Sequence, residues 1–174
     1  MLREETQIAL SKFARAVIKQ SRTNLSRKGK RNTSDLYHSL DYDLNVSKNS
    51  FSLQFFMQDY GAFVDEGVRG KKSSRKAPRS PFRFGTGSGK KGGLTKGIEK
   101  WVKNKGLQFR DDRGKFLSHK STAFIITRSI YQTGIKPSLF FTKPFENEFK
   151  KLPDELIEKF GLDIDEFLES ALNG

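Results

Sequence analysis

The chain of 174 residues contains no cysteine. This absence excludes disulfide bonds, thiolate zinc sites and cysteine nucleophiles. Long apolar runs are absent as well. The longest is the four residues 123–126, whereas a membrane-spanning helix needs about 18 or more. Residues 1–5 lack the apolar core of a secretion signal. We therefore expect a protein without membrane contact that is made in a cytoplasm.

Acidic residues are scarce relative to basic ones. The chain has 33 Lys and Arg against 20 Asp and Glu, a net charge of +13. Such an excess favours a polyanionic partner, most often nucleic acid. A basic soluble surface without such a partner is the alternative. Apolar residues suffice for a packed core, and because 16 of them are Phe, we expect that core to be rich in aromatic rings.

The positive charge is concentrated in residues 69–93, which contain six Gly, two Pro and no acid. Few apolar residues lie here to be buried, so the pattern predicts a long exposed loop. Its expected role is contact with DNA phosphates without reading of bases. A solvated loop without a partner, or one that binds an acidic protein, are the alternatives. Phe82 and Phe84 are expected to anchor the loop rather than to stack on bases. The basic residues are Arg69, Lys71, Lys72, Arg75, Lys76, Arg79, Arg83, Lys90 and Lys91.

The C-terminal part reverses the sign of the charge. Residues 146–169 hold nine acids against three Lys. Copies polarised in this way suit head-to-tail association, although the acidic end can equally fold over its own basic loop. The segment 153–174 also carries an apolar stripe, which we expect to dock on a neighbouring subunit or partner protein. Packing on the chain's own sheet is the alternative. The stripe includes Leu156, Ile157, Phe160, Ile164, Phe167 and Leu168.

Periodicity predicts the local elements. A helix is expected over 3–26 with Ile8 on its apolar stripe, followed by a short turn over 33–40 and a hairpin of alternating strands, 42–46 and 51–55. Further helices are expected over 94–105 with Thr95 as N-cap and Gly106 after its end, over 121–133, over 144–152, and as two short pieces broken at Gly161. Trp101 and Phe124 lie on the expected apolar stripes of their helices, so we predict that both are buried.

Catalytic patterns are weak. Three residues separate Gly85 from Gly89, whereas a phosphate-binding loop has four between its glycines, and Lys91 replaces the Ser or Thr that would bind magnesium. His38 and His119 have no second ligand at metal-binding spacing. Asp111 and Asp112 are typical of a turn. Glu148-Phe149-Lys150 has a nuclease-like spacing but no matching upstream Asp. We expect no catalytic, metal-binding or cofactor-binding residue.

Four short motifs occur in a distinctive order. They are Leu36-x-x-Ser39, Tyr60-Gly61-Ala62-Phe63-Val64-Asp65-Glu66-Gly67, the pair of segments 98–107 and 123–131, and the segment 138–145 ending in Pro144-Phe145. This order resembles the tailed-bacteriophage neck family, whose members are head–tail connector or tail-completion proteins. The likeness covers residues 5–150. It departs from the family where Asp65-Glu66-Gly67-Val68 replaces the usual Glu-x-Gly-Thr.

The resemblance implies an α+β fold in which a long N-terminal helix packs on a mostly antiparallel sheet, with inserted short helices and the long basic loop. It divides the chain into a neck-like domain, 1–152, and an acidic tail, 153–174. It also implies a non-enzymatic virion protein, a ring of copies that contacts portal or adaptor and tail proteins around the DNA channel. The alternatives are a free basic nucleic-acid-binding protein and a nuclease.

Overall fold

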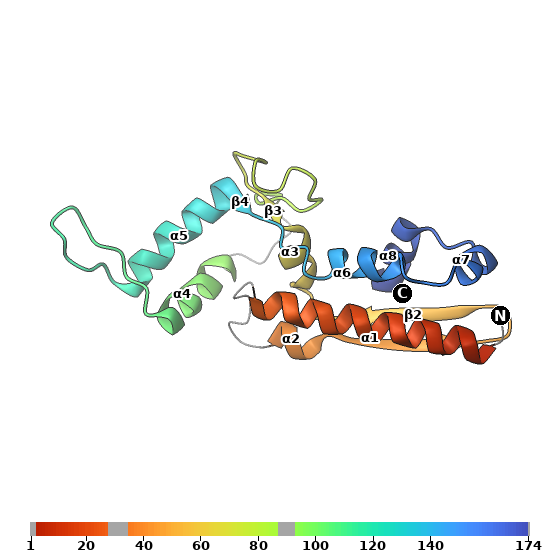
Figure 1. Cartoon of the computed structure of the whole chain (residues 1–174). Coiled ribbons are helices and arrows are strands. Elements are labelled where there is room, and N and C mark those ends of the chain that lie inside the picture. The colour runs from red at the N-terminus through yellow and green to blue at the C-terminus, as the bar shows by residue number, and fades with distance from the viewer. Residues whose placement is uncertain (1–2, 28–34, 87–92, 174) are drawn as a thin grey trace. The chain divides into compact units, whose positions relative to one another are not determined.

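The computed structural model describes residues 3–86 except 28–34, and residues 93–173 (Figure 1). The chain forms two compact units. The terminal unit combines Met1–Asp65 with Leu139–Gly174, and the inserted unit is Glu66–Ser138. This division differs from the expected boundary at residue 152, because the C-terminal helices belong to the same unit as the N-terminal helix. The helices and antiparallel strand pairs make the fold α+β, as expected.

Helix α1, Arg3–Arg27, forms one wall of the terminal unit. Its buried face follows the helical repeat through Leu10, Phe13, Val17 and Leu25. Ile8 is 68 % exposed, so its expected place on the apolar stripe is wrong. The reason is angular, because Ile8 lies two positions, about 200°, from the buried Thr6.

The predicted hairpin is present. Short helix α2, Asp35–Ser39, leads into β1, Asp41–Val46, which pairs antiparallel with β2, Phe51–Phe56. The turn between the strands is closed by the Ser47 N–H, which donates to the Ser50 carbonyl at 2.8 Å. Alternation of side chains places Leu53 and Phe55 in the core. Helix α3, Gly61–Glu66, follows.

Three C-terminal helices complete the core of the terminal unit: α6, Thr142–Phe149; α7, Asp154–Phe160; and α8, Ile164–Asn173. Helix α6 lies against α1, and α8 lies against both α6 and β2 (Figure 1). The ring of Phe13 is 5.1 Å from that of Phe145 and 5.8 Å from that of Phe167, centroid to centroid. The predicted aromatic core therefore joins helices from both ends of the chain.

Most of the tail's apolar stripe packs on the core of its own unit, as in the alternative of packing within the chain, rather than standing free for another subunit. Leu156 and Phe167 are 0 % and 6 % exposed. The other four stripe residues are partly buried and pack against the same cluster: Ile157, Phe160, Ile164 and Leu168. Gly161 separates the two tail helices, as predicted, and adopts a left-handed conformation.

The inserted unit is built on two helices, α4, Gly93–Lys105, and α5, His119–Thr133, which pack against each other. Strand β3, Val68–Arg69, pairs antiparallel with β4, Gly134–Ile135. Helix α4 ends at Lys105, so Gly106 follows its end as expected, and the Leu107 N–H donates to the Val102 carbonyl. Thr95 is not the N-cap, because the helix already includes Gly93. One turn apart on α4, Lys103 hydrogen-bonds Glu99 and lowers the pKa of that carboxylate.

The aromatic residues predicted to be buried in these helices are not both buried. Phe124 is 61 % exposed and Trp101 is partly buried. Val102 and Ala123 fill the contact between the helices instead. Each lies one residue, about 100° of helix rotation, from the aromatic side chain that we expected there.

Candidate nucleic-acid interface

The basic loop is an ordered structure over its described residues, 69–86. The N–H groups of Lys71 and Lys72 donate to the carbonyls of Tyr131 and Gln132 at the end of α5, at 2.9 and 3.1 Å. The loop passes so close that a Cβ on Gly70 would lie 2.2 Å from the Gln132 oxygen. Only glycine allows this approach, which fixes one end of the loop against the helix.

The second attachment of the loop is the segment containing Phe82 and Phe84. The Arg69 N–H donates to the Phe82 carbonyl at 2.8 Å, and the Phe84 N–H donates to the Arg69 carbonyl at 2.9 Å. The Phe84 ring lies 5.7 Å from the Tyr131 ring. The segment is therefore attached through the backbone at both residues and through the ring of Phe84, as the predicted anchoring requires.

The loop also buries residues that we did not expect to be anchors. Ala77 is 1 % exposed and Ser80 is 5 % exposed. The Ser80 hydroxyl donates to the Gly67 carbonyl at 2.8 Å. Short side chains such as these give no clear signal in a hydrophobicity pattern. For this reason the sequence did not indicate that they are buried.

With the backbone held inward, the charged side chains point outward. Arg69 is partly buried, while Lys90 and Lys91 lie outside the described residues. Three of the described loop cations hydrogen-bond within the unit. Lys76 Nζ donates to the Thr133 hydroxyl at 2.8 Å, Arg83 donates to the Lys71 carbonyl at 3.1 Å, and Arg69 donates to the Pro81 carbonyl at 3.5 Å. The exposed cations are Lys71, Lys72, Arg75, Lys76, Arg79 and Arg83.

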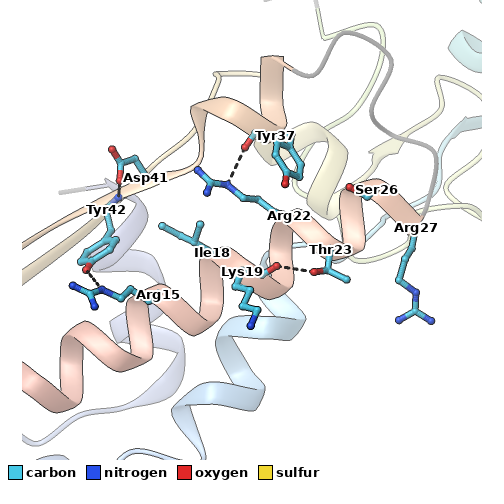
Figure 2. A pocket seen from close by; sticks show the side chains of 10 residues that line it. All are labelled: Arg15, Ile18, Lys19, Arg22, Thr23, Ser26, Arg27, Tyr37, Asp41 and Tyr42. Carbon is cyan, nitrogen blue, oxygen red and sulfur yellow. Dashed lines mark hydrogen bonds between the residues drawn. The ribbon is translucent and has the colours of Figure 1, made fainter.

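A second basic surface lies in the terminal unit, as a groove of about 540 Å³ beside α1 (Figure 2). Arg15, Lys19 and Arg22 contribute to it from one face of the helix, since they are spaced by four and three residues. Tyr37 of α2 and Tyr42 of β1 form the opposite side. Cations and aromatic rings together form surfaces that bind single-stranded nucleic acid.

Two arginines of this groove are held by the protein. Arg22 donates to the Leu40 carbonyl at 2.8 Å and to the Tyr37 carbonyl at 3.2 Å, and its guanidinium lies 5.6 Å from the centre of the Tyr37 ring. Arg15 Nε donates to the Tyr42 hydroxyl at 3.3 Å. The sequence did not indicate this groove, because the groove needs residues from α2 and β1 opposite the basic face of α1.

Charge separates the two units. The inserted unit has 19 Lys and Arg against 4 Asp and Glu, a net +15, and the terminal unit has 14 against 16, a net −2. The inserted unit thus carries the whole charge excess on 73 residues. Such a density attracts phosphate backbones without requiring base contacts. In the described ranges, no group of three or more His, Asp or Glu could hold a metal ion.

Comparison of the chain with protein-family models, with curated proteins and with solved structures finds no match. Among the described helices, none is long and apolar enough to cross a membrane.

Proposed function

We propose that the chain is a structural protein of the tailed-phage neck. In this proposal, copies form a ring between the portal or adaptor and the tail, complete the head–tail joint around the DNA channel and remain in the virion at that junction. The basic loop, residues 69–93, faces the channel and contacts packaged DNA without sequence preference. The protein has no enzymatic role.

The observation that carries the proposal is that the second motif of the resemblance and the closing motif meet at one buried residue. Asp65 is 5 % exposed. Its carboxylate accepts the Phe141 N–H at 2.8 Å and the Thr142 N–H at 3.3 Å. The Asp65 carbonyl accepts the Leu139 N–H at 2.9 Å. The acidic position of the second motif thus caps the helix formed by the closing motif.

The first motif lies beside the second. Leu36 is buried, and a Cβ on Gly61 would lie 3.2 Å from its side chain. The Ser39 hydroxyl oxygen accepts the N–H of Gln58, just before that motif, at 3.0 Å. Motifs that are short and separate in the sequence therefore form one interlocking structure. Members of a family that share this fold would need these motifs in order to make the same contacts.

Charge supports the same proposal. A ring around a DNA channel needs cationic surface, which the exposed loop supplies. Closed rings use heterologous contacts between two different surfaces of each copy, and a chain with units of net +15 and −2 has two such surfaces.

Electron microscopy and mass measurement of the purified chain, with and without a tailed-phage portal protein, test the proposal. We expect rings of uniform copy number, alone or on the portal. A chain that stays monomeric or dimeric and has no affinity for portal, adaptor or tail proteins would contradict the neck assignment.

One alternative has a specific observation in its favour. Exposed loop cations on a unit of net +15 also suit a free, basic nucleic-acid-binding protein that acts as a monomer or dimer. The same experiment separates the two, because this alternative predicts DNA binding without ring formation and without neck partners.

A further inference from the structure

Residues 107–118, here called the arm, connect α4 to α5 and extend away from both helices (Figure 1). The arm holds its own shape. The Leu117 N–H donates to the Phe109 carbonyl at 2.7 Å and the Asp111 N–H donates to the Lys115 carbonyl at 2.9 Å. Between these bonds, the Asp111 carboxylate accepts the N–H groups of two turn residues. The arm is therefore ordered before it meets any partner.

The arm exposes large apolar side chains despite this order. Phe109 and Phe116 are 42 % and 54 % exposed, and neighbouring Phe124 of α5 is 61 % exposed. The Arg110 guanidinium lies 4.0 Å from the centre of the Phe116 ring. Large apolar side chains exposed on an ordered segment are typical of an interaction site.

The arm's charge disfavours nucleic acid as its partner. Over residues 107–118 three basic residues stand against Asp111 and Asp112, a net +1. These acids occupy the turn, where phosphates would approach. The basic loop of the same unit has no acid at all, so a nucleic acid would bind there in preference.

A surface with the matching chemistry exists in the terminal unit. A groove of about 460 Å³ runs between the start of β2 and the tail helices α7 and α8. Phe51 and Phe160 line it, partly exposed, with their ring centres 5.0 Å apart. Asp163 and Glu166, both exposed, add negative charge. Its volume is within the range of about 300–1,000 Å³ that holds compact apolar ligands.

We propose that the arm of one copy docks in this groove of a second copy. Phe116 packs on the rings of Phe51 and Phe160, and Arg110 pairs with Glu166. The contact is heterologous, since arm and groove are different surfaces of the chain, and repetition of such a contact closes a ring or extends a filament. The proposal supplies a contact for the proposed neck ring and rests on that function for its biological setting.

The absence of native cysteine allows a direct test by disulfide formation between copies. Lys115→Cys on the arm is mixed with Ser52→Cys in the groove, and oxidised dimers are measured under denaturing conditions. Lys136→Cys, exposed on the inserted unit outside the arm, replaces the arm variant as the control. We expect at least tenfold more mixed dimer from the arm pair. A yield no higher than the control's would overturn the proposal, as would efficient linkage within one chain carrying both cysteines.

A charge exchange tests the pairing itself. Arg110→Glu and Glu166→Arg should each weaken self-association at least tenfold, whether in solution or on a portal. An equimolar mixture of the two variants should restore it, because each then meets an opposite charge at both contacts. Lys136→Glu and Asp43→Arg serve as matched exposed controls. No effect of the variants, or no restoration on mixing, would contradict the contact.

Two further outcomes separate this inference from the neck assignment. If rings form on the portal but no arm–groove disulfide forms, the arm contact is wrong and the neck assignment stands. If the disulfide forms but no neck partner binds, the neck assignment is wrong and the contact stands. Altered DNA affinity of Arg110→Glu with unchanged self-association would make the arm a nucleic-acid element and overturn the proposal.

Discussion

At the scale of single residues, Asp65 shows how a buried carboxylate is accommodated. The first N–H groups of a helix lack partners within that helix, and Asp65 supplies an acceptor for those at the start of α6 from 76 residues away in the sequence. Phe141, at the N-cap position, has no side chain that could do so. The carboxylate thus accepts hydrogen bonds from N–H groups at the start of α6, and these bonds in turn stabilise the buried carboxylate.

We predict that Asp65→Ala lowers the free energy of unfolding by about 2–3 kcal/mol, because it leaves buried donors without an acceptor. Asp65→Asn should cost less, since its amide oxygen still accepts one bond. Chemical denaturation measures both variants. The exposed Asp43→Ala on β1 is the control, and an Asp65→Ala protein as stable as this control would contradict the capping role.

Glycine variants test a second single-residue feature. Gly67 has φ +74°, and a Cβ there would lie 2.5 Å from the Ile135 carbonyl oxygen. Gly106 has a similar φ of +62° but open space around it. Gly106→Ala should therefore cost only about 1–2 kcal/mol of conformational strain. We expect Gly67→Ala to lower the stability clearly more than Gly106→Ala does. Equal losses of stability in thermal unfolding would show that the backbone around residue 67 shifts to make room for the Cβ.

At the scale of elements, periodic segments were predictable and contact faces were not. Apolar residues recur often enough to reveal a helical or strand period in several segments. These segments are the helix over residues 3–26, the hairpin and both tail helices. The four apolar residues 123–126 are too short a run to define a face, so Phe124 was placed wrongly. The covering of the tail depends on Phe13, Phe145 and Phe167, which come together only in three dimensions.

The candidate site was partly predictable for the same reason. The excess of Lys and Arg in residues 69–93 was visible in the sequence, and so was the role of Phe82 and Phe84 as anchors. The bonds of the loop to Tyr131 and Gln132 join positions about 60 residues apart, which local patterns do not report. The groove beside α1 likewise needs Tyr37 and Tyr42 from other elements.

The tail helices give a prediction at this scale. Phe167→Ala should destabilise the chain by about 3–5 kcal/mol, as expected for a buried Phe, and deletion of residues 154–174 should destabilise it further. Urea denaturation with far-UV circular dichroism measures both. Phe124→Ala, which removes an exposed ring, should change stability by no more than about 0.5 kcal/mol. A truncated chain with unchanged melting would show that the tail is dispensable for the core.

At the scale of the whole molecule, the charge of the inserted unit determines how the protein meets DNA. We predict that neutralising Lys71, Lys72, Arg75, Lys76 and Arg79 to Gln flattens the plot of log affinity against log salt. Loss of five phosphate contacts at about 0.9 each lowers the slope by about 4–5 units. Fluorescence anisotropy over a salt series measures it.

A charge-matched variant controls this experiment. Replacing Lys48, Lys143, Lys150, Lys151 and Lys159 of the terminal unit by Gln removes the same number of charges. We expect its salt slope to stay close to that of the wild type. If both variants lose the same slope, net charge rather than the loop determines binding. If neither does, the loop serves a protein partner or none.

The discontinuous terminal unit also affects how the chain folds during synthesis. Leu25 of α1 and Phe140 share one core, yet over a hundred residues are translated between them. At about 5–20 residues per second, the amphipathic helix leaves the ribosome several seconds before the chain that covers it. Residues 66–138 are complete earlier and can form their own contacts first. The N-terminal helix is therefore the segment that a chaperone would have to shield from aggregation. Because its apolar residues lie almost entirely on the face that is later buried, only that one face needs shielding.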